Sequence, residues 1–159
     1  MGWLKDNLLY YGLEVFCGRF YGAYAGIVVD NVDPENRGRI KALCPAIRLN
    51  EEKDIPKDYW FMPDFPGMGT DPESGEMTGM FWPPDIGTNV WIKFQYGDKD
   101  FPMYSGGFLT TATKSDTFAG DETVKRGFRT KTGHFIRFDD DPENLSILIA
   151  RGDGDGAPT

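Results

Sequence analysis

Few side chains in this chain have the type and spacing that could support catalysis or bind a metal. General acid–base catalysis most often uses histidine, and the 159 residues include one, His134. Two acidic clusters, residues 139–141 and 153–155, carry the carboxylate oxygens that calcium prefers. The first lacks the glycine and the bidentate glutamate of an EF-hand loop, and the second stands at the end of the sequence. We interpret both clusters as solvated turns and expect no metal site.

The cysteines and the motif content argue against an enzyme. Cys17 and Cys44 are far apart in sequence and lack the spacing of zinc ligands. We favour two buried free thiols over a disulfide, which the sequence leaves open. Patterns typical of serine hydrolases, zinc proteases and P-loop proteins are absent. His134 lies in a predicted strand, where histidine is usually structural. The sequence therefore predicts no catalytic residue and no bound cofactor.

The charge balance restricts the partners. Acidic residues outnumber basic residues by 25 to 17, which gives a formal net charge of −8. Nucleic-acid binding depends on clustered Lys and Arg, so this balance argues against a nucleic-acid partner. The sequence has no apolar run as long as a membrane span and no signal-peptide pattern. We expect a soluble protein that is not exported by a cleavable signal.

The central part of the chain has the pattern of an all-β domain. Residues 25–29 and 39–43 form two β-branched or alternating runs, and residues 33–38 between them favour a turn. Later apolar runs predict three further strands, at 59–63, 89–94 and 102–108, while the Gly- and Pro-rich residues 64–79 predict an exposed loop. Five short strands predict a five-stranded OB-like barrel over residues 21–110. Its expected core comprises Ile27, Val29, Ile40, Val90, Ile92 and Phe94.

Four segments flank the predicted barrel. Residues 1–20 form an apolar N-terminal arm in which Leu4 and Leu8 recur at helical spacing. The arm either packs on its own domain or docks on a neighbouring subunit, and the sequence leaves both open. Residues 111–127 are expected to be a linker or neck, residues 128–151 a β-hairpin with a turn at 139–144, and residues 152–159 a flexible tail.

Four sequence blocks carry a resemblance to a known family. The first is GIVVDNVDPENRGRIKALCPAI, residues 26–47, in which Asp33, Pro34, Gly38 and Arg39 form a D-P-x-x-x-G-R turn, preceded by Val32 and followed by Pro45. The others are residues 80–94, 97–107 and 130–140. Together they resemble the OB-fold domain of contractile-tail spike proteins, which are the baseplate central spikes of myophages and the related VgrG spikes of type VI secretion and phage-like injection machines.

The resemblance implies a structural spike in a virion tail baseplate. It implies a homotrimer that joins a baseplate hub protein to the tip and contacts the host outer membrane transiently during piercing. Spike tips of this family that bind iron use an H-x-H pair from each chain, whereas this sequence has His134 alone, so a separate spike-tip protein is expected. The residues after the barrel are too few for a lysozyme domain.

The terminal hairpin is the predicted trimer interface. A lone two-stranded hairpin is marginal in water, so its apolar residues need a partner surface. Folding back over its own barrel is the alternative. The predicted interface comprises Ile136, Phe138, Leu145, Ile147, Leu148 and Ile149.

Two other functions compete with the spike. An OB-fold module that binds oligosaccharide or nucleic acid could use Trp60, Trp82 or Trp91 as stacking platforms, although Trp in a small barrel is usually core. A peptidoglycan hydrolase is the weakest reading of this sequence.

Overall fold

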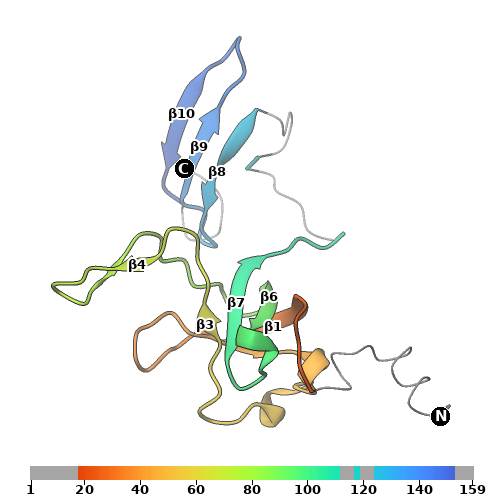
Figure 1. Cartoon of the computed structure of the whole chain (residues 1–159). Coiled ribbons are helices and arrows are strands. Elements are labelled where there is room, and N and C mark those ends of the chain that lie inside the picture. Colours follow the sequence, from red (N-terminus) through yellow and green to blue (C-terminus); the bar gives the residue numbers. More distant parts are fainter. Residues whose placement is uncertain (1–17, 112–116, 119–123, 153–159) are drawn as a thin grey trace. The chain divides into compact units, whose positions relative to one another are not determined.

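The regular structure of the described residues consists of strands and three short 3₁₀ helices, which confirms the all-β prediction (Figure 1). The computed structural model describes residues 18–111, 117–118 and 124–152, so most of the predicted arm and tail and part of the linker lie outside it. The chain divides into two units, Met1–Phe108 and Leu109–Thr159. None of the described helices is long and apolar enough to cross a membrane.

Five strands of the first unit form one curled sheet. They lie in the order β2-β1-β6-β7-β3, and all neighbours are antiparallel except the parallel pair β3 and β7. The two edges of the sheet meet at Ile40 and Phe61, which exchange backbone hydrogen bonds of 3.1 and 2.9 Å. This five-stranded, curled arrangement is OB-like, as predicted. The strands are β1 (Tyr24–Asp30), β2 (Lys41–Leu43), β3 (Met62–Pro63), β6 (Asn89–Phe94) and β7 (Pro102–Gly107).

The loops of this unit contain short elements. The 3₁₀ helices η1 (Pro45–Ile47) and η2 (Glu52–Asp54) follow β2, and η3 (Gln95–Gly97) follows β6. The predicted exposed loop at 64–79 contains a two-stranded ribbon, β4 (Gly69–Thr70) and β5 (Met77–Thr78).

The barrel core confirms most of the predicted buried residues. Ile40, Val90, Ile92 and Phe94 are buried, but Ile27 is 45% exposed and Val29 is half-buried. The full core cluster comprises Val28, Ile40, Ala42, Cys44, Leu49, Phe61, Val90, Ile92, Phe94 and Tyr104.

The assignment of Ile27 to the core was wrong because β1 turns its other face inward. A Cβ atom on Gly26 would lie 2.7 Å from Cγ1 of Ile92, so the Ile92 side chain occupies the space that a side chain at position 26 would need. With Gly26 facing inward, the two-residue period of a strand places Val28 in the core and Ile27 outside.

The second unit contains a three-stranded antiparallel sheet rather than a two-stranded hairpin. Its strands are β8 (Lys125–Arg129), β9 (Phe135–Asp139) and β10 (Ser146–Ala150), in the order β10-β9-β8. The single strand expected over residues 128–138 is interrupted because the chain reverses between Thr130 and His134. The Thr130 N–H donates to the His134 carbonyl at 2.8 Å, and the His134 N–H donates to Oγ1 of Thr130 at 3.1 Å. The predicted hairpin is present as β9 and β10, and β8 adds a third strand.

Candidate assembly surfaces

The turn between β1 and β2 is organised by the carboxylate of Asp33. It accepts hydrogen bonds from the backbone N–H groups of Glu35, Arg37 and Arg39, at 3.0, 2.7 and 3.2 Å. The Arg39 guanidinium adds two more, at 3.0 and 2.6 Å. The two side chains are 3% and 11% exposed. One carboxylate therefore fixes the backbone of the whole turn.

The Asp33–Arg39 pair stays charged over the physiological pH range. The hydrogen bond from Arg39 is the largest cause that holds the pKa of Asp33 well below its usual range; burial opposes it, and the backbone N–H groups add to it. The same contact raises the pKa of Arg39. A general acid or base needs a pKa near the operating pH, so this pair is suited to holding a loop and unsuited to proton transfer.

Two further contacts tie the turn to the barrel. The hydroxyl of Tyr104, on β7, donates to the Gly38 carbonyl at 2.5 Å, and burial raises the pKa of that hydroxyl. The Arg39 guanidinium and the Lys41 ammonium lie 5.5 and 4.7 Å from the ring centre of Trp60, at distances typical of cation–π contacts. The turn is therefore a rigid feature of the barrel surface.

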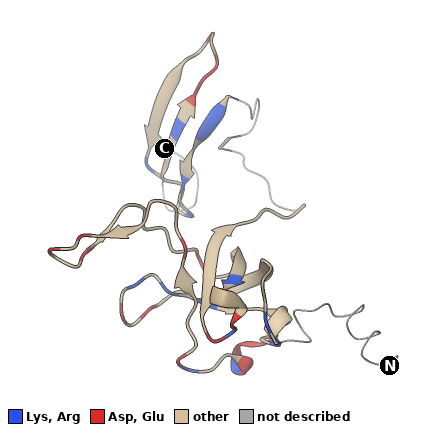
Figure 2. Cartoon of the chain, viewed as in Figure 1, with Lys and Arg blue, Asp and Glu red and all other residues tan. Residues whose placement is uncertain are grey.

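The three tryptophans proposed as stacking platforms differ in their surroundings. The Arg39 guanidinium and the Lys41 ammonium already lie over the ring of Trp60. Trp91 packs on Phe108 with ring centres 4.5 Å apart, and both Trp91 and Trp82 are exposed. The expectation that tryptophans of this barrel are core residues is wrong, since none of these three is fully buried. Lys and Arg are scattered among Asp and Glu on the described part of the barrel rather than gathered in one basic patch (Figure 2), which does not favour a polyphosphate partner.

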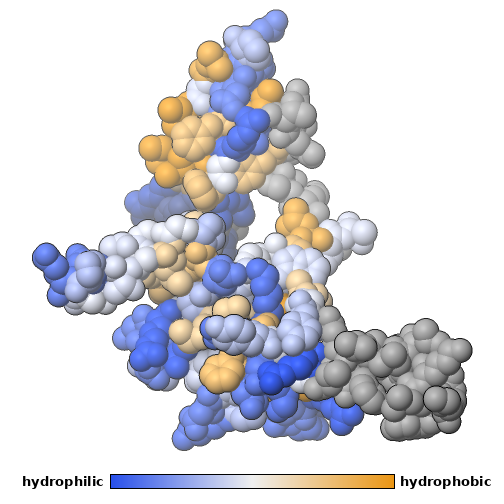
Figure 3. Space-filling model, viewed as in Figure 1, coloured by the Kyte–Doolittle hydropathy of each residue, from blue (hydrophilic) through white to orange (hydrophobic). Residues whose placement is uncertain are grey.

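One face of the β8-β9-β10 sheet is largely apolar, with Arg126, which lies opposite Phe138, as the charged residue among those paired on it. In an antiparallel sheet, residues directly opposite each other share a face. Ile136 lies opposite both Phe128 and Ile149, and Phe138 lies opposite Ile147. These five side chains are 39–74% exposed, and apolar side chains gather on this sheet in Figure 3. We call this set, Phe128, Ile136, Phe138, Ile147 and Ile149, the apolar face.

The predicted interface residues divide between the two faces of this sheet. Ile136, Phe138, Ile147 and Ile149 belong to the apolar face, and Leu145 is exposed just before β10. Leu148 lies opposite Arg137, on the other face, which also carries the buried Phe135 and Asp139. The interface set lacked Phe128, although the alternation of residues 128, 136 and 138 was the signal that could have included it.

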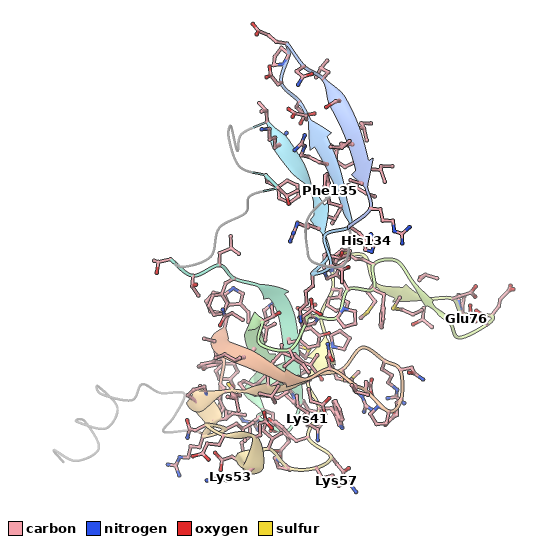
Figure 4. All side chains as sticks on the ribbon, turned by 180° about the vertical axis from the view of Figure 1, so that it is seen from behind. Lys41, Lys53, Lys57, Glu76, His134 and Phe135 are labelled. Carbon is pink, nitrogen blue, oxygen red and sulfur yellow. The ribbon has the colours of Figure 1, made fainter. Side chains whose placement is uncertain are left out.

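The described residues that were considered for catalysis or metal binding either take part in turns or lie apart from one another. His134 lies in the β8–β9 turn (Figure 4), and its Nδ1 accepts a hydrogen bond from the Gly152 N–H at 3.1 Å. In the β9–β10 turn, Asp141 accepts the Glu143 N–H at 3.0 Å. Cys44 is a buried free thiol, whereas Cys17 and residues 153–155 lie outside the described residues. Among the described residues, no three His, Cys, Asp or Glu side chains converge as metal ligands do.

The barrel matches a known domain family. Residues 24–109 match the type VI secretion system/phage-baseplate injector OB domain, a stretch that runs from the start of β1 to just beyond β7 and covers more than half of the chain. No curated protein matches the chain.

Proposed function

Because the chain belongs to the family of type VI secretion system and phage-baseplate injector OB domains, we propose that it is the trimeric central spike of a contractile injection machine. Family membership gives it a structural role in a baseplate. The finer proposal is that three copies join a baseplate hub protein to a separate tip protein. Sheath contraction then drives this assembly through the host envelope, with transient contact to the outer membrane.

The apolar face is the observation that supports the proposed trimer. Three strands bury little on their own, and five large apolar side chains on one side of the sheet are at least 39% exposed. Burying a side chain of this size gains roughly 1.5–3 kcal/mol, so the face has a strong tendency to associate. Three sheets around a three-fold axis would turn their apolar faces inward. Such a prism is stiff, and a stiff needle transmits force without any catalytic step.

The mass of the full-length chain in solution tests this proposal. We expect sedimentation equilibrium at micromolar concentration to give three times the chain mass of 17.9 kDa. A chain that stays monomeric under these conditions would contradict the spike and would favour an OB-type binding module.

The proposal assigns the chain no catalytic role in piercing. We expect the purified protein to release no soluble fragments from peptidoglycan, since the nearly buried carboxylate of Asp33 and the imidazole of His134 accept backbone hydrogen bonds that hold turns in place. Turnover that disappears on substitution of a single carboxylate would overturn this part of the proposal.

A further inference from the structure

A groove of about 460 Å³ lies between the β4–β5 ribbon, β3 and the Asp33 turn. Its volume falls within the range of ligand-binding clefts. The apolar side chains that line it are 38–47% exposed, and two ion-paired residues of the turn stand at its rim. The apolar lining is Met62, Met68, Met77 and Phe81, and the rim pair is Glu35 and Arg37.

The walls of the groove are held in place by close backbone packing. Gly38 has a φ of +71°, and a Cβ atom there would lie 2.8 Å from the Phe81 ring, so Phe81 packs directly on the turn. Gly79 has a φ of +92°, and a Cβ atom there would lie 1.8 Å from the Gly67 carbonyl oxygen, so the base of the ribbon is equally tight. The groove is therefore formed before anything binds in it.

The chemistry of the groove fits an apolar peptide segment. Methionine side chains are flexible and polarizable, and they adapt to apolar partners. The charged groups nearby already have partners: Arg37 pairs with Glu35 at 2.8 Å, and the carboxylate of Asp71 in the ribbon accepts the Glu73 N–H at 2.8 Å. Asn36 and Thr70 add uncharged polar groups to the lining, so the groove offers an occupant mainly apolar contact and, among its described lining residues, no unpaired charge.

We infer that residues 1–17 of a neighbouring copy of this chain occupy the groove. Ten of these 17 residues are Met, Leu, Val, Phe, Tyr or Trp, and three are charged. Such a segment needs a surface to cover its apolar side chains, and the groove needs an apolar segment of low charge. This inference rests on the proposed trimer.

The attachment point of the segment favours a neighbouring copy. The Phe20 N–H donates to the Gly97 carbonyl at 2.8 Å, and Arg19 pairs with Asp98 at 2.9 Å. These contacts lie beside the start of β1, because Tyr24 is paired with Ile92 near the end of β6. The groove lies at the other end of β1. To reach its own groove, the segment would spend about 23 Å, over a third of its extended length, running along β1. Residues 1–17 of a neighbouring copy in a ring-shaped trimer would not have to run along this strand to reach the groove.

Photo-crosslinking of the full chain tests the inference. The substitution Met77→p-benzoylphenylalanine places a photoreactive ring in the groove at an exposed position, and Met68 offers a second site should the first variant fold poorly. We expect irradiation to give covalent oligomers on a denaturing gel, with adducts that map to residues 1–17. The same photoreactive residue at Lys53, exposed on η2, is the matched control and should give no adduct in that segment.

A second variant separates the outcomes. Adding Leu4→Asp and Leu8→Asp to the photoreactive chain should abolish the adducts, because two charges enter an apolar contact. Sedimentation of each sample reports the assembly independently. Trimers without adducts in residues 1–17, or adducts within a single copy, would overturn the docking inference and leave the spike proposal standing. Monomers would overturn both.

Discussion

Replacing Asp33 with Asn is expected to lower the free energy of unfolding of the barrel by about 3–5 kcal/mol. The carboxylate holds three backbone N–H groups and the Arg39 guanidinium. An amide in its place supplies one acceptor oxygen and turns an N–H₂ group toward donors. Arg39 would then be left nearly buried with Glu35, at 2.9 Å, as its remaining carboxylate partner. Chemical denaturation followed by tryptophan fluorescence measures the change.

The matched control is Glu35→Gln, the same chemical change two residues away. The Glu35 side chain is 49% exposed, and exposed ion pairs contribute about 0–1 kcal/mol. We expect the control to stay within about 1 kcal/mol of the parent. A loss of less than about 1 kcal/mol in both variants would show that the turn does not depend on Asp33, and an equally large loss in both would show that Asp33 has no special role in it.

The effect of Asp33→Asn should also depend on pH. Contact with Arg39, opposed by burial and aided by backbone N–H groups, holds the folded-state pKa of Asp33 below the unfolded value of about 3.9. A depressed pKa contributes stability that is fully present above the unfolded value and is lost as the pH falls toward the folded value. The difference in unfolding free energy between the parent and the variant should therefore be constant from pH 7 to about 5 and should shrink below about pH 4. A gap that is unchanged at pH 3 would exclude this electrostatic origin.

The turn shows how far local sequence determines local structure. Residues 33–38 were expected to form a turn, and within it Asn36 and Gly38 have the left-handed φ values of 55° and 71°. This prediction is confirmed because the conformational preferences of Asn and Gly act within a few residues. The five hydrogen bonds to Asp33 were not predicted. An Asp before Pro signals a turn, but the convergence of Arg39 on the same carboxylate depends on how β2 enters the sheet.

Predictions that depended on the packing of distant residues were less reliable. The β-branched run at residues 25–29 gives no strong alternation, and the inward direction of Gly26 follows from Ile92, which lies 66 positions later in the sequence. The alternation through residues 128–138 was real, yet the chain reverses at Thr130–His134. A Thr-rich segment with one glycine fits a strand or a turn equally well, and pairing with β9 decides between them.

The same dependence on long-range pairing applies to the terminal sheet. Ile147, Leu148 and Ile149 were assigned to one predicted interface, but the pairing of β9 and β10 places Ile147 and Ile149 opposite residues of the apolar face and Leu148 opposite Arg137. Which copy or surface covers that face is a property of the assembly, and the sequence of one chain does not state it.

If the protein forms the proposed trimer, the double substitution Ile147→Glu with Ile149→Glu is expected to convert it into monomers at micromolar concentration. Each isoleucine buried against another copy gains roughly 1.5–3 kcal/mol, and each glutamate placed there adds the cost of burying an unpaired charge. Both positions are about 70% exposed or more in the single chain, so the fold of one copy should tolerate the change. Sedimentation equilibrium of the variant measures the mass.

The matched control places two glutamates on exposed β-branched residues of the barrel, Val32→Glu with Ile86→Glu, which carry the same added charge. We expect the control to remain trimeric, because the association is assigned to the terminal sheet. A variant with Glu at 147 and 149 that stays trimeric would remove the apolar face as the main support of the trimer. If both the parent and the variant are monomeric and the variant unfolds more easily, the sheet packs on its own barrel. The mass and the stability of one pair of variants therefore decide between assembly through this face and packing within a single chain.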